Sequence, residues 1–288
     1  MKFTTAKGCT DIPPEEKLIK NKVVSIITNT FEKYGFAPLE TPIIERYETL
    51  AAKFGAGTES DALKETFKLT DQGKRKLGLR FELTTSLGRY VATNPTLKLP
   101  FKRYEIGRNF RDGPIKLGRA REFWQCDADT IGSRSMLAEA EQLAILNDVF
   151  KELNFKIVIK INNRKILNGI LNQAGIKEVK EAIIAIDKLD KIGQDGVAKE
   201  LKERGYSKKQ ITSVLSLVKK DTKLNNLKKQ IKDEEGIQGL QEMQEILKYL
   251  KPLGVKVNYD VSLARGQAYY TGTILEVFLK NSKIESSI

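Results

Sequence analysis

Charged and amide side chains alternate with apolar ones along residues 101–111, FKRYEIGRNFR, and this pattern could bind a polar substrate. Successive residues of a β-strand point to opposite faces, so the alternation predicts a strand with one polar and one apolar face. The apolar face would pack, and the polar face would be left for chemistry. The polar residues that share a face are Arg103, Glu105, Asn109 and Arg111.

A second alternating segment, 122–129, follows the turn signals Gly113-Pro114 and Gly118. An antiparallel hairpin would bring its polar face against that of the first segment. The residues that share this second face are Phe123, Gln125, Asp127 and Asp129.

This hairpin is strongly basic. Seven Lys or Arg residues lie between Lys102 and Arg121, against only Glu105 and Asp112 as acids. Guanidinium groups match phosphate oxygens bidentately, so a phosphate compound is the expected ligand. The alternative is a solvated edge hairpin whose charges keep the protein soluble.

Composition limits the chemistry. The chain has 288 residues, a formal charge of +13 and no histidine, which excludes Ser-His-Asp catalysis and imidazole zinc sites. Its two cysteines, Cys9 and Cys126, provide neither a metal knuckle nor a disulfide framework, so no metal site is expected. We find no apolar run of roughly 18 residues and no secretory h-region, so we expect a cytoplasmic protein without a membrane partner.

Other helices and strands must hold the hairpin in place. The order of predicted helices and strands along the chain indicates an α+β fold. Between the strands 155–162 and 255–263, the interval 164–250 is helical in pattern, as expected of an insertion between two strands of one sheet. Its stretch 206–232 holds eight lysines against the single acid Asp221, which fits either RNA contact or a solvated face. The other predicted elements are helices at 13–34 and 135–153 and a hairpin of 67–70 with 77–84, whose second arm places Arg80, Glu82 and Thr84 on one face.

Residues 262–278 form a Gly-bracketed loop that returns as a strand. Arg265, Tyr269 and Tyr270 lie in this loop. Paired tyrosines more often pack than bind a ligand, so both roles remain open from the residues alone.

Four segments resemble histidyl-tRNA synthetase, a class II aminoacyl-tRNA synthetase, over essentially the whole chain. KGCTDIPPEE with GFAPLETPIIE resembles the family's opening and class II motif 1 around Pro42. FRDGPIKLGRAREFWQCDADTIG resembles motif 2, and LARGQAYYTGT is similar to a signature of histidine-specific members. The helical interval, including IAIDKLDKIG, resembles the family's insertion domain.

The resemblance implies a class II antiparallel sheet flanked by helices and a homodimer through motif 1. It implies a catalytic core of residues 1–163 and 252–288 and a helical insertion of residues 164–251 at the tRNA acceptor arm. The sequence ends at Ile288, before the Gly-rich motif 3 and the anticodon-binding domain. We therefore expect a truncated catalytic region that is weakly active or inactive alone.

The implied activity is that of a histidine-tRNA ligase, which joins L-histidine to ATP with Mg²⁺ and transfers it to tRNA(His). Arg111 and Arg265 match the family's catalytic α-phosphate arginines. The implied histidine-binding residues are Glu82, Leu83, Thr84, Arg111, Gln125, Asp129, Arg265, Tyr269 and Tyr270. The implied ATP-binding residues are Arg111, Arg121, Phe123 and Arg265, and those implied for tRNA are Lys116 and Arg119.

The match has departures. Motif 2 commonly has a glutamate two residues after its arginine, where this chain has Gly113. Asp129 stands where many members have glutamate, and Gln267 and Ala268 replace Leu and Asp of the usual RGLDYY.

Two other classes of protein compete. One is the histidine-binding regulatory subunit of ATP phosphoribosyltransferase, a synthetase paralogue, and the other is a nonenzymatic RNA-binding module. A regulator needs no α-phosphate clamp, so the presence of Arg111 and Arg265 favours the synthetase.

Overall fold

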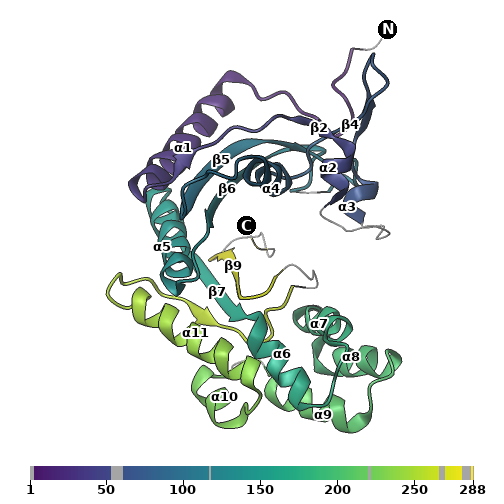
Figure 1. Ribbon diagram of the computed structural model, residues 1–288, viewed down its shortest axis with the longest axis vertical. Coiled ribbons are helices and arrows are strands. Elements are labelled where there is room, and N and C mark those ends of the chain that lie inside the picture. Colours follow the sequence, from purple (N-terminus) through teal and green to yellow (C-terminus); the bar gives the residue numbers. More distant parts are fainter. Residues whose placement is uncertain are drawn as a thin grey trace. The chain divides into compact units, whose positions relative to one another are not determined.

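The computed structural model describes residues 3–52, 61–116, 118–219, 222–265, 270–280 and 287. The chain forms two compact units, Met1–Arg134 and Ser135–Ile288, each of which mixes helices with short sheets (Figure 1). This arrangement confirms the predicted α+β class. The division at Arg134 differs from the predicted ends of the helical segment, and a separate insertion domain at 164–251 stays a prediction. Within the described ranges, every helix is too short or too polar to cross a bilayer.

In the first unit, β5 (Phe101–Phe110) is the central strand of a three-stranded sheet. It runs parallel to β1 (Ala37–Pro38) and antiparallel to β6 (Glu122–Ile131), with Phe101 opposite Ile131 and Phe110 opposite Glu122. The hairpin predicted from alternation is therefore confirmed over both strands.

A second sheet of this unit orders β2 (Ile44–Arg46), β4 (Lys76–Leu79) and β3 (Lys68–Thr70), all antiparallel. The predicted strand 77–84 is wrong beyond Leu79, so Arg80, Glu82 and Thr84 do not share a strand face. Thr84 instead begins α4 (Thr84–Thr93). The strand ends because the Arg80 amide donates to Ile43 O while its carbonyl accepts from Phe110 N, which ties this segment to both sheets.

Helix α1 (Pro14–Lys33) confirms the helix predicted after the double proline. Pro at the first helical position and acidic residues in the first turn both favour a helix start there. Phe31 packs against Tyr104 of β5, with 5.4 Å between ring centroids. The shorter helices of the unit are α2 (Tyr47–Ala52) and α3 (Asp61–Lys64).

In the second unit, β7 (Ile157–Asn163) lies between β8 (Asn258–Tyr259), which is parallel, and β9 (Thr273–Leu279), which is antiparallel. The predicted strand 255–263 is reduced to the two residues of β8. The Asn162 amide explains this, because it donates to the carbonyls of Val261 and Leu263 (3.0 and 2.8 Å) and replaces a backbone ladder there.

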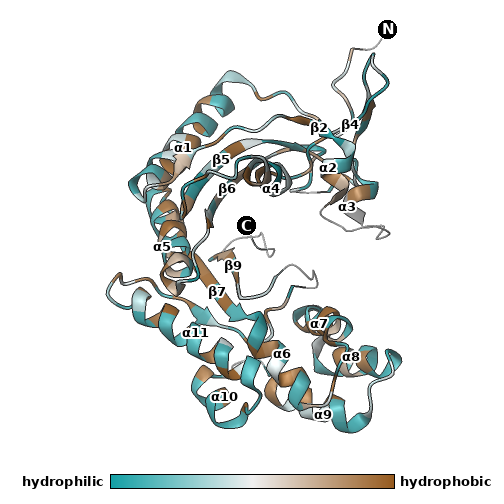
Figure 2. Cartoon of the chain, viewed as in Figure 1, coloured by the Kyte–Doolittle hydropathy of each residue, from teal (hydrophilic) through white to brown (hydrophobic). Residues whose placement is uncertain are grey.

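The segment between β7 and β8 is helical, as predicted. Ile159 and Ile161 of β7 are buried, as are Leu143 of α5 and Met243 of α11. Figure 2 shows hydrophobic colouring along part of β7. The helices of the unit are α5 (Met136–Glu152), α6 (Arg164–Gln173), α7 (Val179–Ile186), α8 (Leu189–Glu203), α9 (Lys208–Leu217), α10 (Leu224–Gln230) and α11 (Glu234–Leu250).

Candidate active site

The register of β5 and β6 brings the two predicted polar faces together. Both strands contribute every second residue to one face, so the polar side chains form two facing rows. The opposed pairs are Arg103 with Asp129, Glu105 with Asp127, Gly107 with Gln125, and Asn109 with Phe123.

The polar row on β5 is buried. Arg103 and Asn109 are 0% exposed and Glu105 is 2% exposed. Buried charges are unfavourable unless they are paired, so each must find a partner inside the fold.

Arg103 pairs with Asp129 across the strands, with 2.8 Å between Nη2 and Oδ2. The contact is an ion pair without the alignment of a hydrogen bond, and the three guanidinium nitrogens of Arg103 make no hydrogen bond within the described part of the chain. Burial raises the pKa of Asp129, and the positive charge of Arg103 opposes that rise.

Asp127 carries the largest resolved carboxyl shift of this face. Burial and the neighbouring charge of Asp129 raise the pKa of Asp127 to about 6, and the charge of Glu82 adds to the rise. Gln125 links this carboxyl to the opposite strand, because its amide lies 3.4 Å from Asp127 Oδ1 and accepts from Asn109 Nδ2 at 2.9 Å. Asp127 therefore interacts with Glu82, Gln125 and Asp129, three residues to which the family resemblance gives a role in histidine binding.

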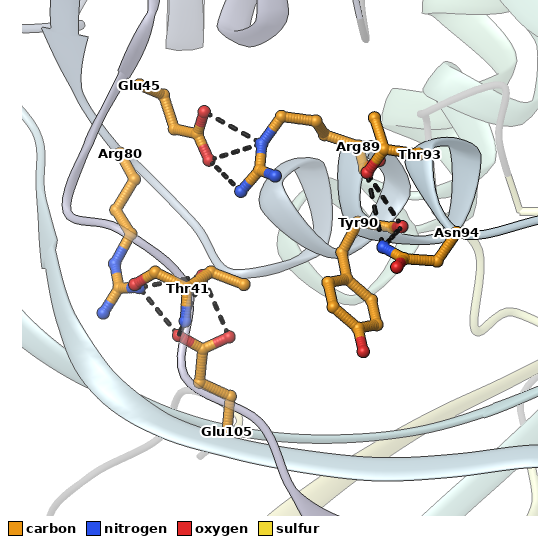
Figure 3. Close-up of polar contacts among 8 residues, drawn as sticks. All are labelled: Thr41, Glu45, Arg80, Arg89, Tyr90, Thr93, Asn94 and Glu105. Atoms are coloured by element: carbon orange, nitrogen blue, oxygen red, sulfur yellow. Dashed lines mark hydrogen bonds and ion pairs between the residues drawn. The ribbon is translucent and has the colours of Figure 1, made fainter. Parts of the chain in front are cut away.

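A buried network joins Glu105 of this row to Arg80 and Thr41 (Figure 3). Arg80 Nη1 donates to Glu105 Oε1 and to the carbonyl of Thr41, both at 2.7 Å. Glu105 also accepts from the amide and the hydroxyl of Thr41 (3.0 and 2.9 Å). A Cβ on Gly107 would lie 2.3 Å from Arg80 Nη2, so a larger residue at that position of β5 would displace the Arg80 guanidinium from this network.

Sequence reasoning assigned no role to Arg80, Glu105 or Thr41. Thr41 and Glu105 lie 64 residues apart, and no local pattern joins them. The one available signal was the place of Glu105 on the polar face of the predicted strand.

The segment Glu82 to Thr84 lies beside the end of β5. Arg111 Nε donates to the carbonyl of Phe81 at 3.1 Å, which fixes the arginine next to this segment. Leu83 is 0% exposed, so its side chain packs in the core and only its backbone is left to meet a ligand. Glu82 Oε1 accepts from the Thr85 hydroxyl at 2.5 Å, and Thr84 is exposed.

Arg111 lies against Phe123, with the guanidinium carbon 4.9 Å from the ring centroid. Both line a cavity of about 400 Å³, which Arg119 and Glu65 also line. Arg121 is engaged nearby in an ion pair with Asp112 (2.9 Å). A cavity with guanidinium groups beside an aromatic ring suits a ligand that has both a flat ring and anionic oxygens.

The tip of the hairpin carries the residues predicted to meet tRNA. Lys116 and Arg119 exchange backbone hydrogen bonds of 3.2 and 2.8 Å, and both are exposed. The short bridge presents both side chains to solvent.

Arg265 belongs to the second unit, where its Nη2 lies 2.6 Å from Glu276 Oε1 of β9. Its carbonyl accepts from Arg164 Nη1 at 2.7 Å, which holds the start of the loop on α6. Tyr270 is half-buried, and Tyr269 lies outside the described residues.

Comparisons with known proteins agree with the motifs. The family model for histidyl-tRNA synthetase matches residues 8–285. A histidine-tRNA ligase of Bacillus cereus is 45% identical over 294 aligned positions, which cover 100% of this chain and 68% of the relative.

Two solved structures have a similar fold. The crystal structure of histidyl-tRNA synthetase from Nostoc sp. is 32% identical with a TM-score of 0.85, over 97% of this chain and 65% of that one. A Bacillus halodurans structure, described as an ATP phosphoribosyltransferase regulatory subunit/histidyl-tRNA synthetase, has a TM-score of 0.84 at 22% identity, over 99% of this chain and 74% of that one, and supports the fold alone. The chain thus spans about two thirds of the length of the Bacillus cereus and Nostoc relatives.

Proposed function

We propose that this chain, which belongs to the histidyl-tRNA synthetase family, activates L-histidine with ATP and transfers the histidyl group to tRNA(His). The family's enzymes are aminoacyl-tRNA ligases of class II, as the sequence predicted. The observation that carries the proposal is the β5–β6 register, which aligns a buried row of acids and amides that leads to Arg111 and Phe123.

The first step would be attack of the histidine carboxylate on the α-phosphate of ATP, with loss of pyrophosphate. Negative charge grows on the phosphoryl oxygens in the transition state, and fixed cations aimed at them lower the barrier. Arg111 suits this role, because the Phe81 carbonyl and the Phe123 ring hold its guanidinium in place. We assign the same role to Arg265.

The amino acid would be recognised by the acidic end of the polar face. We assign the α-amino group to Glu82, the Leu83 backbone, Thr84 and Gln125. Asp129, Tyr269 and Tyr270 would read the imidazole. The raised pKa values of Asp127 and Asp129 support binding of a cationic or hydrogen-donating group there. Such a ligand would stabilise the charged form of two neighbouring carboxylates that burial disfavours.

ATP would bind with Phe123 against the adenine and Arg121 near the triphosphate, and Mg²⁺ would enter on the phosphates. Among the described residues no group of three or more Cys, Asp or Glu could hold a metal ion. This is compatible with Mg²⁺, which proteins usually bind through one or two carboxylates together with substrate phosphates.

The remaining assignments concern partners. Lys116 and Arg119 at the exposed hairpin tip, and the helical segment 164–251, would approach the tRNA acceptor arm. A homodimer would form through motif 1 around Pro42, where Ile43 and Ile44 are 41% and 52% exposed. We place the protein in the cytoplasm.

The test is histidine-dependent exchange of labelled pyrophosphate into ATP by the 288 residues joined to the part of the Bacillus cereus relative that this chain does not span. We expect exchange with histidine and none with other amino acids. If the joined protein binds histidine in calorimetry but shows no exchange, and histidine instead activates a phosphoribosyltransferase partner, the ligase proposal is contradicted and the regulatory alternative is favoured.

A further inference from the structure

The cavity of about 400 Å³ beside Arg111 contains a carboxylate that the sequence gave no role, that of Glu65. Arg111, Arg119 and Phe123 line the same cavity. A lone acid among guanidinium groups needs a reason, since the arginines alone would suffice for an anionic ligand.

Two local features hold Glu65 there. Its carbonyl accepts from the Asp112 amide at 2.7 Å, which fixes its backbone to the residue after Arg111. Gly113 leaves the space that the carboxylate fills, because a Cβ at that position would lie 2.8 Å from both Cδ and Oε1 of Glu65. Glycine at position 113 therefore allows the Glu65 carboxylate to pack against the motif 2 loop.

The Glu65 carboxylate is available to a ligand. Within the described part of the chain, no hydrogen bond or ion pair engages its oxygens. An ionised carboxylate only accepts hydrogen bonds, so it favours a ligand group that donates them. The neighbouring Phe123 ring favours a flat base, and the arginines favour phosphate.

We propose that Glu65 accepts a hydrogen bond from the 6-amino group of adenine and so selects ATP among purine nucleotides. This inference rests on the proposed function, from which it takes ATP as the nucleotide. It makes Glu65 a specificity residue that acts through nucleotide binding and has no part in the phosphoryl chemistry.

Calorimetric binding of ATP and of purine riboside triphosphate, which lacks the amino group, tests the proposal without requiring catalysis. A hydrogen bond to a charged group predicts that the wild-type chain prefers ATP by roughly tenfold to a hundredfold. Glu65→Ala should abolish the preference by weakening ATP alone, and Glu65→Gln should retain part of it. Gly113→Ala, which displaces the carboxylate, should resemble Glu65→Ala.

The matched control is Glu122→Ala, which removes an acid whose partner is Arg108 and which does not line the cavity. Its preference for ATP should equal that of the wild type. The proposal is overturned if Glu65→Ala keeps the full preference, if it weakens both nucleotides equally, or if the wild-type chain binds no ATP. A preference that depends on Glu65, found together with no pyrophosphate exchange by the protein joined to the remaining part of its relative, would contradict the ligase proposal only.

Discussion

Arg103 Nη2 lies 2.8 Å from Asp129 Oδ2 across the β5–β6 hairpin, and the arginine side chain is 0% exposed whereas that of the aspartate is 30% exposed. The buried cation thus balances an acid that still reaches the surface of the site. Asp129 is the residue that we propose reads the imidazole, so we infer that Arg103 positions it for histidine recognition.

Replacement of Arg103 by Met should destabilise the fold, because it leaves Asp129 largely buried without its counter-charge. Breaking such a pair typically costs about 3 kcal/mol. Arg108→Met is the matched control on the same strand, since Arg108 is 52% exposed and its pair with Glu122 should contribute less than about 1 kcal/mol. Urea unfolding of both variants measures the difference, and equal losses would contradict the role given to Arg103.

Asp127 should make stability depend on pH. Its pKa is about 6 in the fold against an ordinary value of 3.8, so the folded state keeps the proton to higher pH than the unfolded state. The contribution of Asp127 to the free energy of unfolding is therefore fully present below pH 4. As pH rises through 6, that free energy falls by about 3 kcal/mol. Asp127→Asn should remove that loss. Chemical unfolding of the wild type and of Asp127→Asn at pH 4.5 and 7 measures this loss. If the difference in unfolding free energy between the two proteins is the same at both pH values, the pKa of Asp127 is not raised.

The buried pair of Arg80 and Glu105 should show strong coupling. Glu105→Leu leaves the guanidinium of Arg80 unpaired beside Thr41, and we expect a loss of about 3–5 kcal/mol in unfolding free energy. The double variant Arg80→Met/Glu105→Leu should recover part of that loss, because neither charge stays buried. A double-mutant cycle by urea unfolding gives the coupling energy, and simple additivity would show that the pair is unimportant.

Two helical glycines should respond oppositely to alanine. In α6, a Cβ on Gly169 would lie 2.4 Å from Gly236 Cα of α11, so Gly169→Ala must separate the helices and should cost more than about 1 kcal/mol. In α4, a Cβ on Gly88 meets nothing within 4 Å, so Gly88→Ala should stabilise by about 0.5–1 kcal/mol. Thermal unfolding followed by circular dichroism compares the two, and shifts of the same sign would be inconsistent with this packing.

Arg111 should be essential for histidine activation. Removal of one preorganised donor to a growing charge costs about 3 kcal/mol, or roughly a hundredfold in pyrophosphate exchange. Arg108→Ala is the control, because Arg108 points away from Arg111's face of β5 and pairs with Glu122. We expect Arg111→Ala to lower the exchange rate at saturating histidine and ATP while circular dichroism remains that of the wild type. Comparable exchange in both variants would remove Arg111 from the mechanism.

Local sequence patterns predicted the hairpin and the face on which its polar residues lie, and the motifs indicated the family. Period-2 alternation in 101–111 and 122–129 fixes which residues share a face, and Gly113, Pro114 and Gly118 locate the turn. The same local signals predicted α1 and the helical segment after β7. These predictions were possible because strand alternation, turns and helix starts each depend on residues that are close together in the sequence.

The partners of the buried charges on that face could not be predicted from local patterns. The alternation marked Arg103 and Glu105 as polar, but their burial depends on partners 64 residues away, such as Thr41, and on the register with Asp129. The strand predicted through Thr84 stops at Leu79 because Arg80 bonds to two different sheets, which no local pattern encodes. Glu65 likewise reaches the cavity because the fold sets it against Gly113. The partners of buried charges come from segments that are distant in the sequence, so they are defined only once the chain has folded.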